Sequence, residues 1–414
     1  RDMELFDTLY PMSLRPQAHD IIRTWAFYTV LRCLLITGEE PFDEIMMGGF
    51  ILSSDGRPMH TSLGNVIDPL EILEEDGADP LRYYAAKCKL GEDNPFRPKD
   101  LVRGKRLMKK LWSAIQFVGG AIEQYDAGER DLSSYGDVDR WMLSRYSRVV
   151  EECTAYMDDF DYADAIRTAE HFLWHELADH YIEMVKHRVY EEGDEDALHV
   201  LYTVGLGVTK LLAPFLPHIA EEIYHRHFRE HDGAASVHVA AWPEPVLRDM
   251  EAEERGELVK NVISRLRDWK SSQGIALNAP VENTVTVYGT TDDAFEMIQG
   301  SSGIIRSTLS IPNLSVEAGA PETEEVPSAV TPDYAKIGPE YGEATGCIVE
   351  QLRERDLDEL YREREEQGSI SLSNVDGETV TIPGDYVAFD MQHRIRGETA
   401  DLINMGDIII SIEG

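Results

Sequence analysis

The sequence predicts a multidomain protein in which an α/β segment is followed by a helical bundle and a small α+β domain. An apolar strand pattern at 45–52 leads through a polar loop into a helix start. Apolar residues at helical spacing continue almost without interruption over 111–242, which is typical of a bundle of long helices. After residue 283, apolar and polar residues begin to alternate in the pattern typical of strands. A chain of 414 residues is long enough for two or three such domains.

The composition is that of a folded, intracellular protein. Hydrophobic residues make up 43% of the chain, and no apolar run approaches the ~20 residues of a membrane helix. The cysteines are far apart, without the spacing of a metal site or a disulfide framework, and this predicts a reduced, cytoplasmic protein. The chain starts with Arg1 rather than methionine, so we expect it to be a piece of a longer protein.

The net charge of −38 restricts the choice of partners. The negative electrostatic field of such a charge repels nucleic acid in dilute salt. Taken alone, it argues against an RNA partner. Adaptation to a salty cytoplasm is the other interpretation, because at 1 M salt the Debye length falls to ~3 Å. We favour this halophilic interpretation, since acidic residues are spread along the whole chain and lysine is scarce beside arginine.

The first hundred residues contain the candidate phosphate site. A short strand is predicted at Tyr10–Arg15, and an amphipathic helix starts at Asp20, which is a suitable N-cap. Ile45–Leu52 is apolar enough for a buried strand, and a polar loop then leads to Asp68 and Pro69, which can open a helix. Because phosphates bind where a strand ends before a helix N-terminus, this geometry predicts an anion site.

The residues of this loop carry a family resemblance. DGRPMHTSLGNVIDP resembles the Lys-Met-Ser-Lys-Ser loop of class I aminoacyl-tRNA synthetases and the Leu-Gly-Asn-Val-Ile-Asp-Pro run after it. The matching positions are Met59, Ser62, Leu63, Gly64, Asn65, Asp68 and Pro69. Pro58 and Thr61 replace the lysines of the family, and His60 replaces its first serine. Those lysines neutralise charge on the ATP phosphates as pyrophosphate leaves, and neither histidine nor threonine is a fixed cation at pH 7.

The resemblance implies a site for ATP, with Mg²⁺ carried by the nucleotide. LRPQAHDIIRTWAFYTVLR is similar to the segment that precedes this loop in archaeal valyl-tRNA synthetases, where the aspartate at the position of Asp20 lies at the ATP ribose. The implied catalytic residues are Met59, His60, Thr61 and Ser62, and the implied ATP-binding residues are His19, Asp20, Gly48, Met59 and Ser62. Arg57 is a candidate replacement for the missing lysines.

A cationic run follows in this acidic chain. Between residues 97 and 110 the sequence carries seven lysines and arginines and only Asp100 against them. Several fall on one helical face, and in the family this connective helix lies beside the tRNA stem. The residues predicted to contact the RNA backbone here are Arg97, Lys99, Arg103, Arg106 and Lys110.

Helices are predicted at Arg140–Tyr156, Tyr162–Tyr190 and Leu198–Arg226. FLWHELADHYIEMVKHRVY and LLAPFLPHIAEEIY resemble the anticodon-binding bundle of the valine, isoleucine and leucine synthetases, and the first is most similar to valyl enzymes. Lys186 and Arg188 are further candidates for RNA contact. His171, His175 and Asp179 have the spacing of metal ligands, but the family uses this helix structurally, so no metal site is predicted.

In the last part of the chain the spacing of apolar residues changes from that typical of helices to that typical of strands. Strands are predicted at Asn283–Tyr288, Pro312–Val316, Ser369–Leu372, Thr379–Ile382 and Ile408–Ile412. Helices are predicted at Ala294–Gln299 and Ile348–Gln367, with an acidic loop at Glu317–Thr331. PDYAKIGPEYGEATGCIVEQL resembles, more loosely, the tail domains of archaeal valyl and isoleucyl synthetases.

The resemblance therefore implies the C-terminal part of a valyl-tRNA synthetase. Its expected domains are the second half of a Rossmann-type catalytic domain at 1–98, the connective helix and anticodon-binding bundle at 99–245, and the tail domain at 246–414. The expected partners are tRNA-Val, ATP and valine, in a monomer without membrane contact. The His-Ile-Gly-His half and the editing domain are absent from these 414 residues, so alone they are predicted to be inactive. The alternatives are a non-catalytic tRNA-binding or assembly paralogue and, less favoured, an isoleucyl enzyme.

Overall fold

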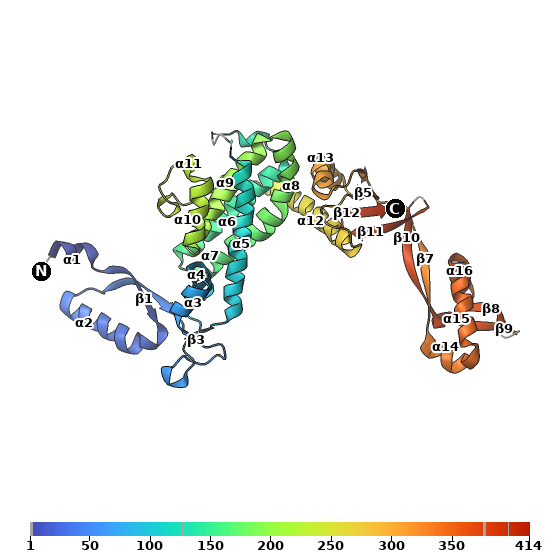
Figure 1. Cartoon of the computed structure of the whole chain (residues 1–414), viewed down its shortest axis with the longest axis horizontal. Coiled ribbons are helices and arrows are strands. Elements are labelled where there is room, and N and C mark those ends of the chain that lie inside the picture. Colours follow the sequence, from blue (N-terminus) through green and yellow to red (C-terminus); the bar gives the residue numbers. More distant parts are fainter. Residues whose placement is uncertain (1–2, 124, 126–127, 129, 376–377, 396) are drawn as a thin grey trace. The chain divides into compact units, whose positions relative to one another are not determined.

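A computed structural model describes residues 3–123, 125, 128, 130–375, 378–395 and 397–414 (Figure 1). These residues belong to two compact units, Arg1–Lys260 and Asn261–Gly414. The division falls inside helix α12 (Met250–Ser272). Within the described ranges, every helix is too short or too polar to span a bilayer.

The first unit begins with a small parallel sheet. After α1 (Met3–Leu9), strand β1 (Met12–Ala18) pairs in parallel with β2 (Phe42–Gly48), and α2 (Phe27–Thr37) connects the two strands. Parallel strands need such a crossover, because a tight turn cannot join them. The strand predicted at Tyr10–Arg15 is present but extends further along the chain.

The predicted burial of this region is wrong. The strand pattern at 45–52 is divided between β2 and the short β3 (Ile51–Leu52), and Ile45 and Phe50 are exposed. The apolar face of the helix predicted from Asp20 is also exposed, with Leu35 at 77%. These side chains surround a two-stranded sheet, which offers too little surface to cover them.

Two short helices connect this region to the bundle. Asp68 caps α3 (Pro69–Glu75) by accepting the Leu70 amide at 2.8 Å, as predicted, and α4 (Ala78–Lys87) follows. The carboxylate of Asp79, at the start of α4, accepts the amides of His218 and Ile219 at 3.2 and 2.8 Å. Since those amides open a helix of the bundle, Asp79 joins α4 to it.

The bundle confirms in substance the helices predicted at Arg140–Tyr156 and Tyr162–Tyr190. Its helices are α5 (Pro98–Ala121), α6 (Asp137–Asp158), α7 (Tyr162–His171), α8 (Ile182–His187), α9 (Glu195–Leu212), α10 (Pro217–His227) and α11 (Arg229–Asp232). The π-helical segments η5 (Phe172–Tyr181) and η6 (Arg188–Glu192) extend α7 and α8 into one helical run. Trp141, Leu107, Leu111, Ile115, Phe172 and Leu201 lie in its buried core.

The single helix predicted at Leu198–Arg226 is wrong. The chain leaves α9 after Leu212 and starts α10 at Pro217. Pro217 has no amide hydrogen to donate and its ring would clash inside a helix, whereas the first helical position tolerates it. The break also leaves the Pro214 carbonyl free to accept the Arg82 guanidinium at 2.7 Å.

The second unit contains a six-stranded sheet in the order β6-β5-β12-β11-β10-β7. Its strands are β5 (Thr284–Gly289), β6 (Leu314–Ala318), β7 (Thr323–Pro332), β10 (Val387–Ile395), β11 (Glu398–Asn404) and β12 (Ile408–Glu413). Helix α13 (Asp292–Leu309) connects the parallel pair β5 and β6. The helices α14 (Tyr334–Tyr341), α15 (Thr345–Glu354) and α16 (Leu357–Gln367) pack with the hairpin β8 (Ser369–Val375) and β9 (Glu378–Pro383) around a separate apolar cluster.

Several predictions for this unit need correction. The acidic segment predicted as a loop at Glu317–Thr331 contains β7, whose pairing with β10 holds it in the sheet. The single helix predicted at Ile348–Gln367 is two helices, because Asp356 caps the second by accepting the Glu359 amide. Helix α13 is much longer than predicted, and β10 and β11 were not predicted.

Candidate functional site

Three of the predicted ATP-binding residues, His19, Asp20 and Gly48, lie at or directly after the carboxyl ends of the two parallel strands. Ala18 at the end of β1 is paired with Gly48 at the end of β2. His19 and Asp20 follow β1 directly and are exposed, and the His19 ring meets Phe50 edge-on at 4.9 Å. Open parallel sheets commonly bind ligands at the carboxyl ends of their strands, which is where the strand pairing brings these residues together.

Asp20 does not cap the helix, which was the alternative to its expected role at the ATP ribose. The short helical turn η1 spans His19–Ile21, and its N-cap is Ala18, with no side-chain hydrogen bond. Asp20 lies inside that turn, with its carboxylate exposed. The side chain is therefore available to a ligand rather than used by the backbone.

Asn65 holds the polar loop after β3 in shape. Its amide oxygen accepts the His60 backbone amide at 2.9 Å. Its amide nitrogen donates to the Pro58 carbonyl at 3.0 Å and to the Ser53 hydroxyl at 3.1 Å. One side chain therefore joins both sides of the loop. Asn65 was noted only as a match to the family, and its crosslinking role could not be read from the sequence.

The middle of the loop is a turn with an internal ion pair. The Ser53 amide donates to the Arg57 carbonyl at 2.9 Å, and Gly56 between them takes a left-handed φ of 79°. The Arg57 Nε lies 2.6 Å from the Asp55 carboxylate. Hydrogen bonds from Ser53 and Arg57 lower the pKa of Asp55 to about 2. The candidate replacement cation, Arg57, is therefore already paired with a carboxylate.

The predicted catalytic residues divide between core and surface. Met59 packs against the buried cluster of Tyr84, Phe96 and Leu101, so it anchors the loop. His60, Thr61 and Ser62 are exposed, and the latter two lie in a single turn of 3₁₀ helix, η3 (Thr61–Leu63). The sequence pattern alone did not distinguish the anchor from the exposed residues.

Removing the Asn65 crosslink should loosen this loop. In Asn65→Ala three hydrogen bonds are lost, and we expect the local opening free energy at the His60 amide to fall by about 1–3 kcal/mol. Hydrogen exchange of that amide measures the change. Ser62→Ala, at an exposed neighbouring position, is the control. Unchanged protection in Asn65→Ala would mean that other contacts hold the loop.

The second part of the candidate site is the cationic face of α5. Arg97 precedes the helix, and Lys99, Arg106 and Lys109 lie on it; all four are exposed and lack a carboxylate partner among the residues described. Lys109 was not among the predicted contact residues, although the sequence run includes it. Cations without a nearby carboxylate are the ones best able to bind phosphate.

Other predicted contact residues are engaged within the bundle. The Arg103 Nε lies 3.1 Å from the buried Glu170, which also accepts the Tyr83 hydroxyl at 2.9 Å and Lys87 at 3.1 Å. The Lys110 Nζ lies 2.6 Å from Asp179. Arg103 keeps 61% of its side-chain surface exposed, so its charge still reaches the solvent.

Lys186 and Arg188 have different environments despite their proximity in sequence. Lys186 lies 2.5 Å from Glu183 at the surface. Arg188 lies inside the bundle, where it donates to Asp139 at 2.7 and 3.0 Å and to Asp194 at 2.9 Å. Burial alone would lower the pKa of Arg188, but the hydrogen bonds and charge of Asp139 raise it. The guanidinium of Arg188 is thus a structural group.

The histidine pair considered for a metal is exposed. His175 contacts Asp179 at 3.4 Å, and that carboxylate also binds Lys110. In the described part of the chain, no three potential ligands are grouped as a metal site would need.

Comparisons with known proteins agree with this arrangement. The family model described as "tRNA synthetases class I (I, L, M and V)" matches residues 1–97, which include the strand ends and the loop. The "Anticodon-binding domain of tRNA ligase" model matches residues 139–285. The valine–tRNA ligase of Pyrococcus furiosus is 37% identical over 410 residues, which is 98% of this chain and 46% of that protein. The chain is homologous to valine–tRNA ligases over nearly its whole length.

Other valine–tRNA ligases match to a similar extent. That of Methanothermobacter thermautotrophicus is 38% identical over 99% of this chain and 46% of its own length. That of Natronomonas pharaonis is 37% identical over 95% of this chain and 44% of its own length. The chain thus spans about half the length of the curated relatives it matches. All of α5, with Lys99, Arg106 and Lys109, lies between the ranges matched by the two family models but within these alignments.

Proposed function

We propose that this chain acts as part of a valine–tRNA ligase, in which it supplies the loop beside the adenylate site and binds tRNA-Val. The observation that carries the proposal is the 37% identity to valine–tRNA ligases over 98% of the chain. In this proposal, residues 1–98 belong to the Rossmann-type catalytic domain, 99–245 bind the tRNA with the connective helix and the bundle, and 246–414 form the tail domain.

The adenylate side of the proposal rests on the strand ends. His19, Asp20 and Gly48 would line the ATP site, Ser62 would approach from the loop, and Mg²⁺ would arrive with the nucleotide. Among these residues Asp20 is the one with a carboxylate. This carboxylate is exposed beside the strand ends, where it can accept a hydrogen bond from a ribose hydroxyl. Met59 would hold the loop from its buried side.

The first fifty residues expose a large apolar surface, which supports the proposal that another polypeptide segment packs against it. Exposed large side chains include Trp25, Phe27, Tyr28, Leu34, Leu35 and Ile36. A surface of this kind, around a two-stranded sheet, is typical of an interrupted core. We infer that another segment covers it and completes the nucleotide-binding sheet.

The tRNA side rests on the free cations of α5. Arg97, Lys99, Arg106 and Lys109 would contact the RNA backbone, with Arg103, Lys110 and Lys186 near enough to the surface to contribute to the field. Such contacts position RNA without reading its sequence, so selectivity would come from the bundle. At the salt of a halophilic cytoplasm the repulsion from the acidic surface would be screened.

These 414 residues alone should not activate valine. We expect no ATP–pyrophosphate exchange above background from the isolated chain, because the other half of the ATP and valine site is not part of it. The same preparation should bind tRNA with a valine anticodon more tightly than tRNA with an isoleucine anticodon. Measurable exchange would overturn the first statement, and equal binding of the two tRNAs would overturn the second.

One observation favours a second candidate, a tRNA-binding paralogue without catalysis. The loop has Pro58, His60 and Thr61 where the family has lysine, serine and lysine, and Arg57 is paired with Asp55. Supplying the missing half as a separate polypeptide tests this alternative. Recovery of exchange would identify a catalytic chain, and tRNA binding without exchange would identify the paralogue.

A further inference from the structure

A pocket of about 220 Å³ lies where α4, the short strand β4 (Asn94–Pro95) and the start of α5 meet. Charged and phenolic side chains dominate its lining, which includes Tyr84, Lys87, Arg97, Asp100 and Arg103. Among the described residues that line it are none of those predicted to bind ATP. The pocket is therefore a separate feature of this junction between two helices.

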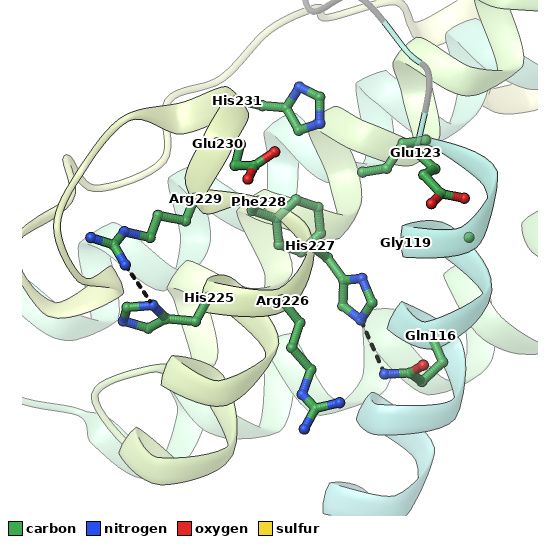
Figure 2. A pocket seen from close by; sticks show the side chains of 12 residues that line it. Gln116, Gly119, Glu123, His225, Arg226, His227, Phe228, Arg229, Glu230 and His231 are labelled. Carbon is green, nitrogen blue, oxygen red and sulfur yellow. Dashed lines mark hydrogen bonds between the residues drawn. The ribbon is translucent and has the colours of Figure 1, made fainter.

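A larger pocket, of about 440 Å³, lies between the C-terminal end of α5 and the turn from α10 into α11 (Figure 2). Its polar side chains are paired with one another, Gln116 with His227 at 3.0 Å and His225 with Arg229 at 3.2 Å. Among its described lining residues, no buried side-chain polar atom lacks a hydrogen-bond partner. The smaller pocket differs in this respect.

The hydroxyl of Tyr84 is a buried donor without an acceptor. Tyr84 is 7% exposed, and its hydroxyl has no hydrogen-bond partner in the part of the chain that the structure describes. The nearby thiol of Cys88 is directed at the Tyr84 backbone carbonyl, 3.4 Å away. An unpaired buried hydroxyl is costly, and an acceptor bound in the pocket would explain it.

The charges that act on this hydroxyl come from the pocket. Burial first, and then Cys88 and the charge of Asp100, raise the pKa of Tyr84, whereas the charge of Arg97 lowers it. All three neighbours line the pocket, so the hydroxyl faces the same space. Because its pKa is raised, the hydroxyl keeps its proton at neutral pH and remains a donor.

Two cations of the pocket are held in position by one buried carboxylate. The Lys87 Nζ and the Arg103 Nε each lie 3.1 Å from Glu170, whose side chain is 8% exposed. An ammonium has three hydrogens to donate and a guanidinium has five, so both keep donors for a further acceptor. With Arg97 added, three cations face the two carboxylates of Glu170 and Asp100. The pocket is thus positive in an acidic chain, and it suits an anion.

The start of α5 adds to this positive potential. Arg97 is the N-cap of this 24-residue helix, and its side chain makes no capping hydrogen bond. The end of a long helix with unpaired amides attracts negative charge. This effect alone explains Asp100 in the first turn, but it does not explain the buried hydroxyl of Tyr84.

Asp100 restricts which anion fits. A carboxylate accepts hydrogen bonds and donates none, so it repels an oxygen that carries no proton. Inorganic phosphate keeps a proton on one oxygen at neutral pH, and that hydroxyl can donate to Asp100. Sulfate and the diester phosphates of an RNA backbone have no such proton. The lining therefore distinguishes a protonated oxyanion from the phosphates of RNA.

We propose that this pocket binds inorganic hydrogen phosphate. Tyr84, Lys87 and Arg103 donate to its unprotonated oxygens, and its hydroxyl donates to Asp100. The bound ion joins α4 to α5 behind the apolar cluster in which Tyr84 packs with Met59, the anchor of the adenylate-site loop. The inference is independent of the proposed tRNA binding, because it concerns an ion that RNA does not supply.

The test is a calorimetric titration of the whole chain with orthophosphate at neutral pH and constant high salt. We expect saturable binding at one site, and binding about tenfold weaker for sulfate and for dimethyl phosphate, which lack the proton. Tyr84→Phe removes only the hydroxyl and should weaken phosphate binding about tenfold. Tyr135→Phe is the matched control, since Tyr135 is 5% exposed and its buried hydroxyl also has no partner among the described residues. Its phosphate affinity should stay within about twofold of the wild type.

Asp100→Asn tests selectivity separately from affinity. An asparagine amide can donate to an unprotonated oxygen, so the preference for phosphate over sulfate should fall from about tenfold to about one. Three results would each overturn the proposal: no phosphate binding, equal binding of phosphate, sulfate and dimethyl phosphate by the wild type, or the same loss in both tyrosine variants. Because the titration contains no RNA, none of these results bears on tRNA binding.

Discussion

Replacing Arg188 by methionine is expected to lower the free energy of unfolding of the bundle by about 3–5 kcal/mol. The side chain is only 14% exposed, and its guanidinium binds Asp139, which is 1% exposed. Methionine keeps much of the apolar volume, but among the residues described it leaves the buried Asp139 carboxylate with the Tyr181 hydroxyl, at 2.7 Å, as its one side-chain donor. An unpaired buried charge costs far more than the pair contributes.

Lys186→Met is the matched control for this prediction. It removes a cation two residues away, from an exposed pair with Glu183, and should change stability by less than about 1 kcal/mol. Denaturant titration of both variants measures the difference. A loss below 1 kcal/mol in Arg188→Met, with weakened RNA binding, would instead assign Arg188 to the RNA surface.

Replacing Lys270 by methionine should destabilise the second unit by about 3 kcal/mol. Lys270 is completely buried near the end of α12. Its ammonium donates to the carbonyls of Leu277, Ala279 and Leu309, at 2.8, 2.6 and 3.1 Å. Methionine fills a similar volume but leaves these three acceptors without their donor, and each buried unpaired acceptor costs about 1–3 kcal/mol at most.

The pH dependence of Lys270 provides a second measurement. Burial and the charge of Arg267 lower its pKa in the folded chain. Between that value and 10.5 the unfolded chain binds more protons, so the contribution of Lys270 to stability rises with pH across this window. Lys336→Met, at a surface pair with Asp385, should show neither effect. Equal stability of Lys270→Met and wild type would contradict a stabilising role for the three hydrogen bonds of Lys270.

Sequence-based prediction succeeded for elements that are marked by a short motif within the element or at its start. Asp68 and Pro69 marked a helix start correctly, and the alternation at Asn283–Tyr288 marked β5. Prediction failed for strands whose pairing partners are distant in the chain. β7 lies in an acidic segment that resembles a loop, and only its pairing with β10 makes it a strand.

Burial was the least predictable property. The apolar pattern from Asp20 to Leu35 has the spacing of a buried helix face, yet Leu35 is 77% exposed, because a pattern does not specify what covers it. Arg188 shows the opposite error. Its charge led us to predict a surface position, whereas its hydrogen bond to Asp139 holds the side chain inside the bundle. Asn65 was visible as a match to the family, but its three partners became apparent only from the folded loop.

The most direct test of RNA binding along α5 is the salt dependence of tRNA-Val binding. Each phosphate contact contributes a slope of about 0.7–0.9 in log Kd against log salt. We predict that Arg106→Gln with Lys109→Gln lowers the slope by about 1.5 and weakens binding. Arg167→Gln with Arg248→Gln removes the same charge from surface pairs with Asp164 and Glu151 and should leave the slope unchanged. Equal slopes in the two double variants would contradict RNA binding along α5.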